Sequence, residues 1–212
     1  FILGHPEHIE YDYEYIYAQV TRRVAEAKAK RLGLENPSEV PLRALFLGGG
    51  SYTFPRYLQH RYPNAVCDVA EIDPAVTEAN HVALGLPRDT TIQTHWGDAR
   101  QFVERSLGGE PYDLIFGDAF NDFSVPWHLT TREFNERIAQ LLDDHGAYMI
   151  NIIDVYRSDK VAAENALENA QIEAVSQVFM EAGNVKESAE TLARGIRTAW
   201  RGEPLGSRFG LI

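Results

Sequence analysis

The stretch Ala44-Leu45-Phe46-Leu47-Gly48-Gly49-Gly50 decides the fold of this chain, because an apolar run leads directly into a cluster of glycines. A second apolar run, Val69-Ala70-Glu71-Ile72-Asp73, follows about 20 residues later and ends in acidic residues. Glycines let the backbone turn sharply and approach a ligand, since no Cβ stands in the way. A carboxylate at the end of the next strand can accept hydrogen bonds from both hydroxyls of a ribose. The two runs therefore predict a nucleoside site in an open α/β sheet, with Glu71 as the ribose-binding residue.

Strand-like and helix-like segments alternate after residue 42. Apolar runs predict strands at 43–47, 65–71, 91–95, 112–116 and 147–153. The stretches between them predict helices at 54–61, 75–84, 100–106 and 131–142. Strands that alternate with helices form a mostly parallel sheet with helices on both faces. We therefore predict a Rossmann-like α/β fold.

Helical segments are expected on either side of this core. Apolar residues at helical spacing predict a helix over 10–30. Ala- and Glu-rich stretches at 161–182 and 185–200 are typical of helices, and no strand is predicted there. The expected organisation is an N-terminal helical segment (1–40), a nucleoside-binding core (41–158) and a helical C-terminal tail (159–212). The tail would cover the core or form the surface of a homodimer.

The composition excludes several classes of partner. A formal net charge of −11 argues against nucleic acid and anionic membranes, because phosphate binding needs clustered Lys and Arg. The single cysteine, Cys67, excludes an internal disulfide, and the histidines lack metal-ligand spacing, so no metal is expected. No apolar stretch is long enough to span a bilayer and no signal peptide is visible, which predicts a cytoplasmic protein without membrane contact of its own. Since the chain does not begin with Met, it is consistent with a processed product or with the soluble part of a longer, membrane-anchored parent.

Glycines and carboxylates follow the predicted strands. In open α/β sheets, ligands bind outside the carboxyl ends of the strands, where the strand order reverses. These ends carry the segments Gly48 to Tyr52, Glu71 to Asp73, Gly97-Asp98 and Gly117 to Asp122. Asp118 follows the apolar run 112–116 after a single glycine, Gly117, so it is the candidate for a catalytic group that faces a ligand on the neighbouring strand ends. Asp73 precedes a proline and is predicted to cap a helix, whereas Asp98 suits either a cap or a ligand contact.

Several motifs follow one another between Ala44 and Asp154 in the order FLGGGSYTF, VAEIDPAVTE, GDARQFV, YDLIFGDAFND and LTTREFNERIAQLLDDHGAYMIN. This order resembles the catalytic core of the polyamine aminopropyltransferases, the spermidine synthases. These enzymes share the fold of class I S-adenosylmethionine-dependent methyltransferases. Within this family, the motifs resemble a bacterial spermidine-synthase-like domain that is often fused to a permease-like membrane segment. The resemblance implies aminopropyl transfer from decarboxylated S-adenosylmethionine to a diamine such as putrescine, and thus a role in polyamine biosynthesis.

The resemblance also implies a role for each matching residue. Asp118 would be the catalytic residue that accepts a proton from the attacking amine, and Asp98 would bind the adenine amino group. The residues that would hold decarboxylated S-adenosylmethionine, or S-adenosylmethionine itself, are Gly48, Gly49, Gly50, Ser51, Glu71, Ile72, Asp98 and Ala99. Those that would bind the polyamine substrate are Tyr13, Tyr17, Asn121 and Asp122.

The chain departs from the family pattern at two amine-binding positions. Ser51 stands where the family usually carries an acidic residue, and Asn121 replaces its second acidic residue, with Asp122 one position later. Two further functions therefore remain open. The chain could be an S-adenosylmethionine-dependent methyltransferase that acts on a small molecule, or a non-catalytic nucleoside-binding regulatory domain. His128 is expected to have a structural or gating role, because no nucleophile is paired with it.

Overall fold

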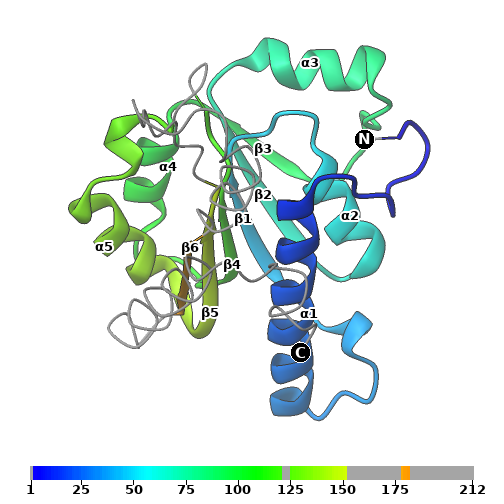
Figure 1. Ribbon diagram of the computed structural model, residues 1–212, viewed down its shortest axis with the longest axis vertical. Helices are drawn as coiled ribbons and strands as arrows, with labels where there is room; N and C mark the ends of the chain where they lie inside the picture. Colours follow the sequence, from blue (N-terminus) through cyan, green and yellow to red (C-terminus); the bar gives the residue numbers. More distant parts are fainter. Residues whose placement is uncertain (1, 121–124, 152–177, 182–212) are drawn as a thin grey trace, which may run out of the picture.

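A single sheet with the strand order β3-β2-β1-β4-β5-β6 forms the centre of the computed structural model, which describes residues 2–120, 125–151 and 178–181 (Figure 1). The strands β1 to β5 pair in parallel, and β6 pairs with β5 in the antiparallel sense. The bounds of the strands are β1 Arg43–Leu47, β2 Val66–Glu71, β3 Gln93–Trp96, β4 Tyr112–Gly117, β5 Leu142–Ile150 and β6 Val178–Glu181. The strand order reverses between β1 and β4, which is the position where such sheets bind ligands.

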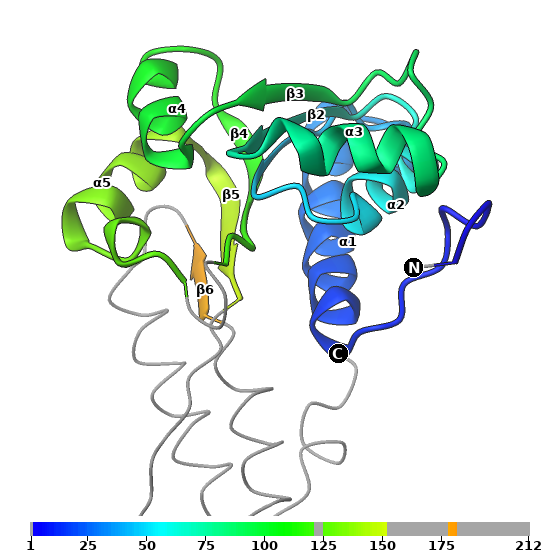
Figure 2. The same ribbon diagram turned by 90° about the horizontal axis from the view of Figure 1, so that it is seen from above.

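Helices cover both faces of the sheet. Their bounds are α1 Asp12–Leu32, α2 Thr53–Arg61, α3 Pro74–Ala83, α4 Ala99–Ser106 and α5 Arg132–Leu141, with short 3-10 helices η1 Pro37–Glu39 and η2 Trp127–Leu129. The helices α1 and α2 pack on one face, and α4 and α5 pack on the other (Figure 2). The helix α3 lies beside α2, and Arg56 of α2 donates a 2.9 Å hydrogen bond to the side chain of Asn80 in α3.

The core consists of two apolar layers because successive side chains of a strand point to opposite faces. On the α1 and α2 face, the rings of Phe46 and Phe116 stack at 4.7 Å, and the Tyr17 ring lies 5.0 Å from Phe116. On the other face, Leu45 and Ile115 belong to a cluster with residues of α4 and α5. Both faces of the central strands are buried, which explains why their sequences are continuous apolar runs.

The α/β fold predicted from the sequence is confirmed, but the C-terminal prediction is wrong at one place. Residues Val178–Glu181 form β6, although they lie within the segment 161–182 predicted as a helix. They pair with β5 from Ala147↔Glu181 to Ile150↔Val178. The free edge of β5 offers unpaired backbone groups, and pairing with them overrides the weak local helix preference. The rest of the predicted tail lies outside the described residues, and the division of the chain at residues 40 and 158 stays a prediction.

The strand β5 also begins earlier than expected, at Leu142 rather than at residue 147, so that it follows α5 without a loop. In the part of the chain that the structure describes, no helix is long and apolar enough to cross a membrane.

Candidate active site at the carboxyl ends of the strands

The glycine loop after β1 approaches its neighbours so closely that only glycine fits. Gly48 has a φ of +104°, and a Cβ at this position would lie 2.7 Å from the backbone oxygen of Asp118. A Cβ on Gly49 would lie 2.8 Å from the ring of Tyr52 and 2.9 Å from a carboxylate oxygen of Glu71. Gly50 has a φ of +49°, with open space where its Cβ would be. The loop therefore brings the ends of β1, β2 and β4 together.

Glu71 is buried at the end of β2, and the backbone around it fixes the orientation of its carboxylate. Its Oε2 accepts a 2.7 Å hydrogen bond from the N–H of Gly49, and its Oε1 accepts a 2.9 Å hydrogen bond from the N–H of Asp73. Each carboxylate oxygen can accept a second hydrogen bond. Glu71 is therefore held rigidly and keeps the capacity to accept hydrogen bonds from a ribose, the role predicted for it.

The residues next to Glu71 and Gly50 differ in their roles. Ile72 follows β2 and is 69% exposed, so its apolar side chain is free to pack against a flat ring of a ligand. Asp73 accepts a 2.8 Å hydrogen bond from the N–H of Ala75, which confirms that it caps α3. The hydroxyl of Ser51 is 2.7 Å from the hydroxyl of Thr53 at the start of α2. Ser51 thus supports the loop but supplies no charge.

Asp98 caps α4 and also contacts a side chain from a distant loop. Its Oδ1 accepts a 3.0 Å hydrogen bond from the N–H of Gln101, and its Oδ2 lies 2.8 Å from Nε2 of His128. Partial burial raises the pKa of Asp98, but the hydrogen bonds from Gln101 and His128 outweigh burial and hold the pKa below its ordinary value. Asp98 is therefore ionised at neutral pH. Ala99, the first residue of α4, is buried beside it.

Asp118 lies directly after β4, and its backbone N–H donates a 3.1 Å hydrogen bond to the carbonyl oxygen of Leu47. Its Oδ1 accepts a 3.0 Å hydrogen bond from Nδ2 of Asn151, and the hydroxyl of Tyr13 donates a further one. Burial raises the pKa of Asp118 above its ordinary value, although both hydrogen bonds act in the opposite direction. A carboxylate with a raised pKa binds a proton more readily, which is what a general base needs.

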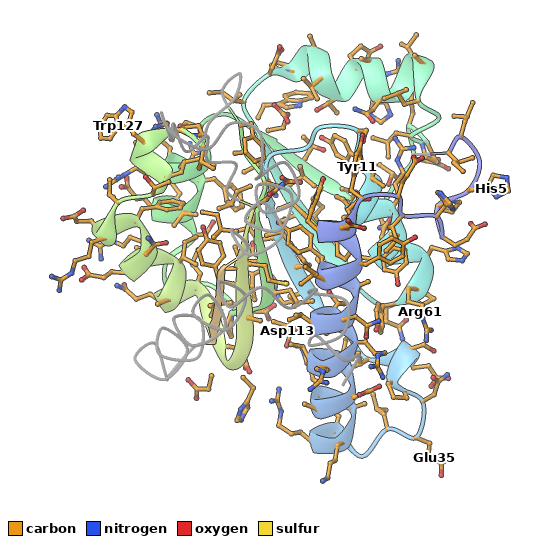
Figure 3. All side chains as sticks on the ribbon, in the orientation of Figure 1. His5, Tyr11, Glu35, Arg61, Asp113 and Trp127 are labelled. Atoms are coloured by element: carbon orange, nitrogen blue, oxygen red, sulfur yellow. The ribbon has the colours of Figure 1, made fainter. Side chains whose placement is uncertain are left out.

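Tyr13, Glu14 and Tyr17 in the first turns of α1 interact electrostatically with Asp118, and Figure 3 shows Tyr11 at the beginning of this helix. Burial and the negative charge of Asp118 raise the pKa of Tyr13, so its hydroxyl stays protonated and donates. The Tyr17 ring packs edge-on against Tyr13 at 5.4 Å, and its buried hydroxyl has no hydrogen-bond partner in the described ranges. The structure thus brings Tyr13 and Tyr17 to Asp118 from the other end of the sequence.

Glu14 is a buried carboxylate that the sequence analysis missed; it closes the capping box of α1 and feels the charge of Asp118. It is 3% exposed, and its Oε2 accepts hydrogen bonds from the N–H groups of Glu10 and Tyr11, at 3.2 and 3.3 Å. Burial raises the pKa of Glu14, and the charge of Asp118 adds to this effect. The sequence signal that could have identified it is its position three residues before Tyr17, which puts both side chains on the same face of the helix. Asn151, also missed, follows β5 and could have been found because it lies at a strand end.

Two of the predicted substrate-binding residues, Asn121 and Asp122, lie outside the described residues. Among the residues that the structure describes, no group of three His, Cys, Asp or Glu side chains could hold a metal ion.

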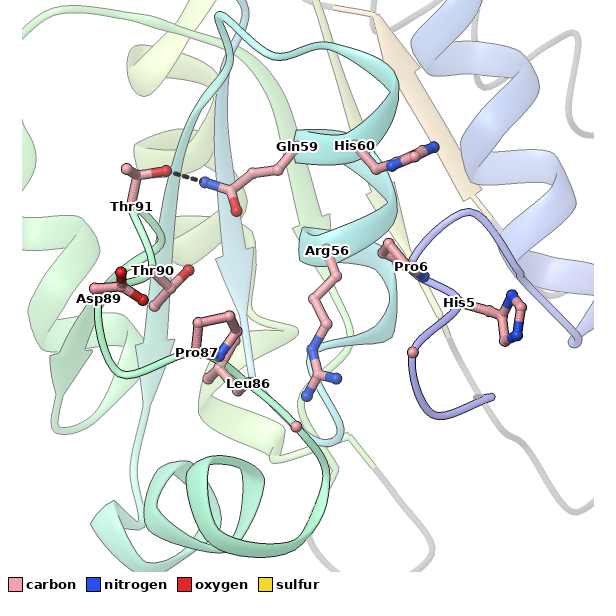
Figure 4. Close-up of a pocket in the computed structure, with 12 residues that line it drawn as sticks. His5, Pro6, Arg56, Gln59, His60, Leu86, Pro87, Asp89, Thr90 and Thr91 are labelled. Carbon is pink, nitrogen blue, oxygen red and sulfur yellow. Dashed lines mark hydrogen bonds between the residues drawn. The ribbon is translucent and has the colours of Figure 1, made fainter.

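A separate hollow of about 420 Å³ lies between the N-terminal segment, α2 and the loop before β3 (Figure 4). Its lining residues Asp89 to Thr91 precede β3, so this hollow is not at the carboxyl ends of the strands.

No protein-family model matches this chain. A polyamine aminopropyltransferase of Vibrio vulnificus (strain CMCP6) is 38% identical over 119 residues, which make up 56% of this chain and 39% of that protein. A crystal structure of a probable spermidine synthase from Corynebacterium glutamicum ATCC 13032 is 28% identical, with a TM-score of 0.56. This match covers 72% of our chain and 51% of the other. The chain thus spans about half the length, or less, of these relatives.

A crystal structure of human methyltransferase-like protein 13 in complex with SAH has a TM-score of 0.60 and 17% identity. The match covers 90% of our chain and 94% of the other, and it shows a common fold. The sequence match to the aminopropyltransferase and the structural match to the spermidine synthase agree with each other. This chain is thus similar in sequence and in structure to spermidine-synthase-like proteins, and it has the α/β fold of the class I methyltransferases.

Proposed function

We propose that this chain is a transferase that moves the aminopropyl group of decarboxylated S-adenosylmethionine to the amine of a diamine. The observation that carries the proposal is the position of Asp118. Its backbone touches the glycine loop, and its carboxylate is held by Asn151 and Tyr13. A base is therefore fixed next to the place where Gly48, Gly49 and Glu71 are expected to hold the nucleoside. The relatives named as aminopropyltransferase and probable spermidine synthase support this reaction.

The nucleoside would lie across the ends of β1, β2 and β3. Glu71 would accept hydrogen bonds from the ribose hydroxyls, and Ile72 would pack against the adenine. Asp98 would accept a hydrogen bond from the adenine amino group, since its ionised carboxylate can only accept. The absence of side chains on Gly48 to Gly50 would let the sulfonium end pass close to the backbone.

The chemistry is a displacement at carbon. The lone pair of the acceptor amine forms a bond to the aminopropyl carbon next to the sulfonium, and the carbon–sulfur bond breaks with its electron pair going to sulfur. The products are the aminopropylated amine and methylthioadenosine. An ammonium group has no lone pair, so one proton must leave before or during the attack. Asp118 would accept this proton, and its raised pKa suits it for the task.

The acceptor would bind beside α1. The carboxylates of Glu14, which is buried, and Asp118, which is half-buried, both lie in this region, and among the described residues neither forms an ion pair with a Lys or Arg side chain. A bound polyamine cation would add a positive charge that stabilises both carboxylates. Glu14 would thus replace charge that the family carries where Ser51 and Asn121 stand here. Tyr13 would present its ring to the cationic chain, whereas Tyr17, only 1% exposed, would support the Tyr13 ring from the core.

The test is product formation by the purified chain with decarboxylated S-adenosylmethionine and putrescine, followed by mass spectrometry. Methylthioadenosine and an aminopropylated amine should appear in equal amounts. Methylthioadenosine without the second product would indicate hydrolysis. If neither product forms with putrescine or with longer diamines, the proposal is wrong.

Methyl transfer is the second candidate function. The structural match to human methyltransferase-like protein 13 covers nearly all of both chains, and Ser51 removes one charge that favours the decarboxylated cofactor. The two functions predict opposite preferences in calorimetry. An aminopropyltransferase should prefer the decarboxylated form, because Glu14 and Asp118 would repel the carboxylate of intact S-adenosylmethionine. Tight binding of intact S-adenosylmethionine would favour methyl transfer, and binding without any turnover would favour a regulatory domain.

A further inference from the structure

The side chain of His128 approaches Asp98 from the short helix η2. Its Nε2 lies 2.8 Å from Oδ2 of Asp98, although the two residues are 30 positions apart in the sequence. Both side chains are partly exposed, His128 at 31% and Asp98 at 24%. This contact therefore lies at the surface of the candidate nucleoside site rather than in the core.

The direction of this hydrogen bond follows from the charge on Asp98. The carboxylate is ionised at neutral pH, as argued above, and an ionised carboxylate has no hydrogen to donate. His128 must therefore carry a hydrogen on Nε2 and donate it to Oδ2. The other oxygen, Oδ1, already accepts from the N–H of Gln101. With a donor on each oxygen, the plane of the carboxylate is fixed, and each oxygen keeps one position for a further donor.

The backbone of His128 is anchored independently of its ring. Its carbonyl oxygen accepts a 3.0 Å hydrogen bond from Nη1 of Arg100, and the same nitrogen lies 3.3 Å from the hydroxyl of Thr131. Thr131 caps α5 through the N–H of Phe134. A change of the His128 side chain therefore leaves the loop attached to α4, so that the effect of the ring can be measured separately.

We propose that His128 is a positioning residue that orients Asp98 toward the adenine amino group and thereby makes the site select adenine over hypoxanthine. The inference rests on the proposed nucleoside site and adds a specificity determinant to it. Adenine presents an amino donor at its sixth carbon, whereas hypoxanthine presents a carbonyl oxygen there. A carboxylate held in one plane pairs with the donor and repels the carbonyl. Without His128, only the hydrogen bond from the N–H of Gln101 would hold the carboxylate of Asp98. The carboxylate could then rotate and would lose part of its preference for adenine.

The chain contains a matched control in the pair of His95 and Asp68. Nε2 of His95 lies 2.6 Å from Oδ1 of Asp68, and His95 is 37% exposed, close to the value for His128. This pair joins β3 to β2 within the sheet, and Asp68 also accepts a 3.1 Å hydrogen bond from the hydroxyl of Tyr112. Loss of the His95 donor should lower stability without a change in base selectivity.

The experiment compares the affinities for methylthioadenosine and methylthioinosine by calorimetry. The wild-type chain should prefer methylthioadenosine by about tenfold or more, as expected for a hydrogen bond to a charged acceptor. His128→Ala should reduce this preference by about threefold or more, to the level of a carboxylate that is free to rotate. His128→Gln should retain it, because the amide nitrogen of Gln reaches the place of Nε2. His128→Asn should lose it, because its shorter side chain does not reach. His95→Gln should keep the wild-type preference.

The outcomes separate the two proposals. If the wild-type chain binds neither compound, the proposed nucleoside site is wrong, and so is the proposed role of His128. If the wild-type chain prefers methylthioadenosine and His128→Ala keeps the full preference, the role of His128 is wrong while the nucleoside site stands. If His128→Ala does not fold, the comparison of His128→Gln with His128→Asn tests the inference. An equal preference of these two variants for methylthioadenosine would contradict it.

Discussion

The backbone N–H of Gly49 donates a 2.7 Å hydrogen bond to Oε2 of Glu71, and this bond joins the glycine loop to the end of the neighbouring strand. The N–H of Asp73 holds the other oxygen. The carboxylate thus has its orientation set before any ligand binds. A site that is rigid in advance loses less conformational entropy on binding, which strengthens the affinity for a ligand that fits it.

Glu71→Gln should weaken methylthioadenosine binding by about tenfold or more, because hydrogen bonds to a charged acceptor are worth about 1.5–3 kcal/mol each. Each oxygen of Glu71 accepts a hydrogen bond from a backbone N–H, and the NH2 group of Gln cannot accept one. One backbone N–H would therefore lose its acceptor, and the free energy of unfolding should fall by about 1–3 kcal/mol. Calorimetry and denaturant unfolding measure the two effects. The matched control is Asp73→Ala, which removes a helix cap at a cost of about 1 kcal/mol and should leave affinity unchanged. Equal affinity for wild type and Glu71→Gln would remove Glu71 from the site.

Asp118→Asn should lower turnover of decarboxylated S-adenosylmethionine with a diamine by about 10² or more, the usual loss for a positioned general base. The affinity for methylthioadenosine should change little, since that product carries no amine. Steady-state kinetics and calorimetry on the same preparation measure both quantities. A variant that turns over at the wild-type rate would show that the proton leaves by another route.

The same substitution should raise stability at neutral pH. Asp118 has a folded-state pKa above its ordinary value, so the folded chain binds this proton more tightly than the unfolded chain. Stability linked to Asp118 is therefore present below the ordinary pKa and is lost as the pH rises through the raised value. Asp118→Asn removes this loss, so its melting temperature should exceed that of wild type at pH 7 and approach it in acid. A variant that is less stable than wild type at pH 7 would contradict this.

Gly48→Ala should destabilise the fold much more than Gly50→Ala. The new methyl group at position 48 would lie 2.7 Å from the backbone oxygen of Asp118, and the φ of +104° is unfavourable for alanine. At position 50 the methyl group meets open space, so only the left-handed backbone costs energy, about 1–2 kcal/mol. Urea unfolding of the two variants gives the comparison. Equal losses would mean that the loop moves away from β4 to make room.

The sequence by itself determined the parallel α/β sheet, the glycine loop, the acidic strand ends and the cap at Asp73. These features depend on patterns that are local, namely hydrophobic period, glycine clusters and helix-start residues. Only the tertiary structure decided that β6 pairs with β5, that Tyr13 and Glu14 reach Asp118, and that His128 holds Asp98. Each of these contacts joins segments far apart in the chain. Their geometry follows from the strand order and from how α1 and η2 pack near the strand ends, which no local pattern encodes.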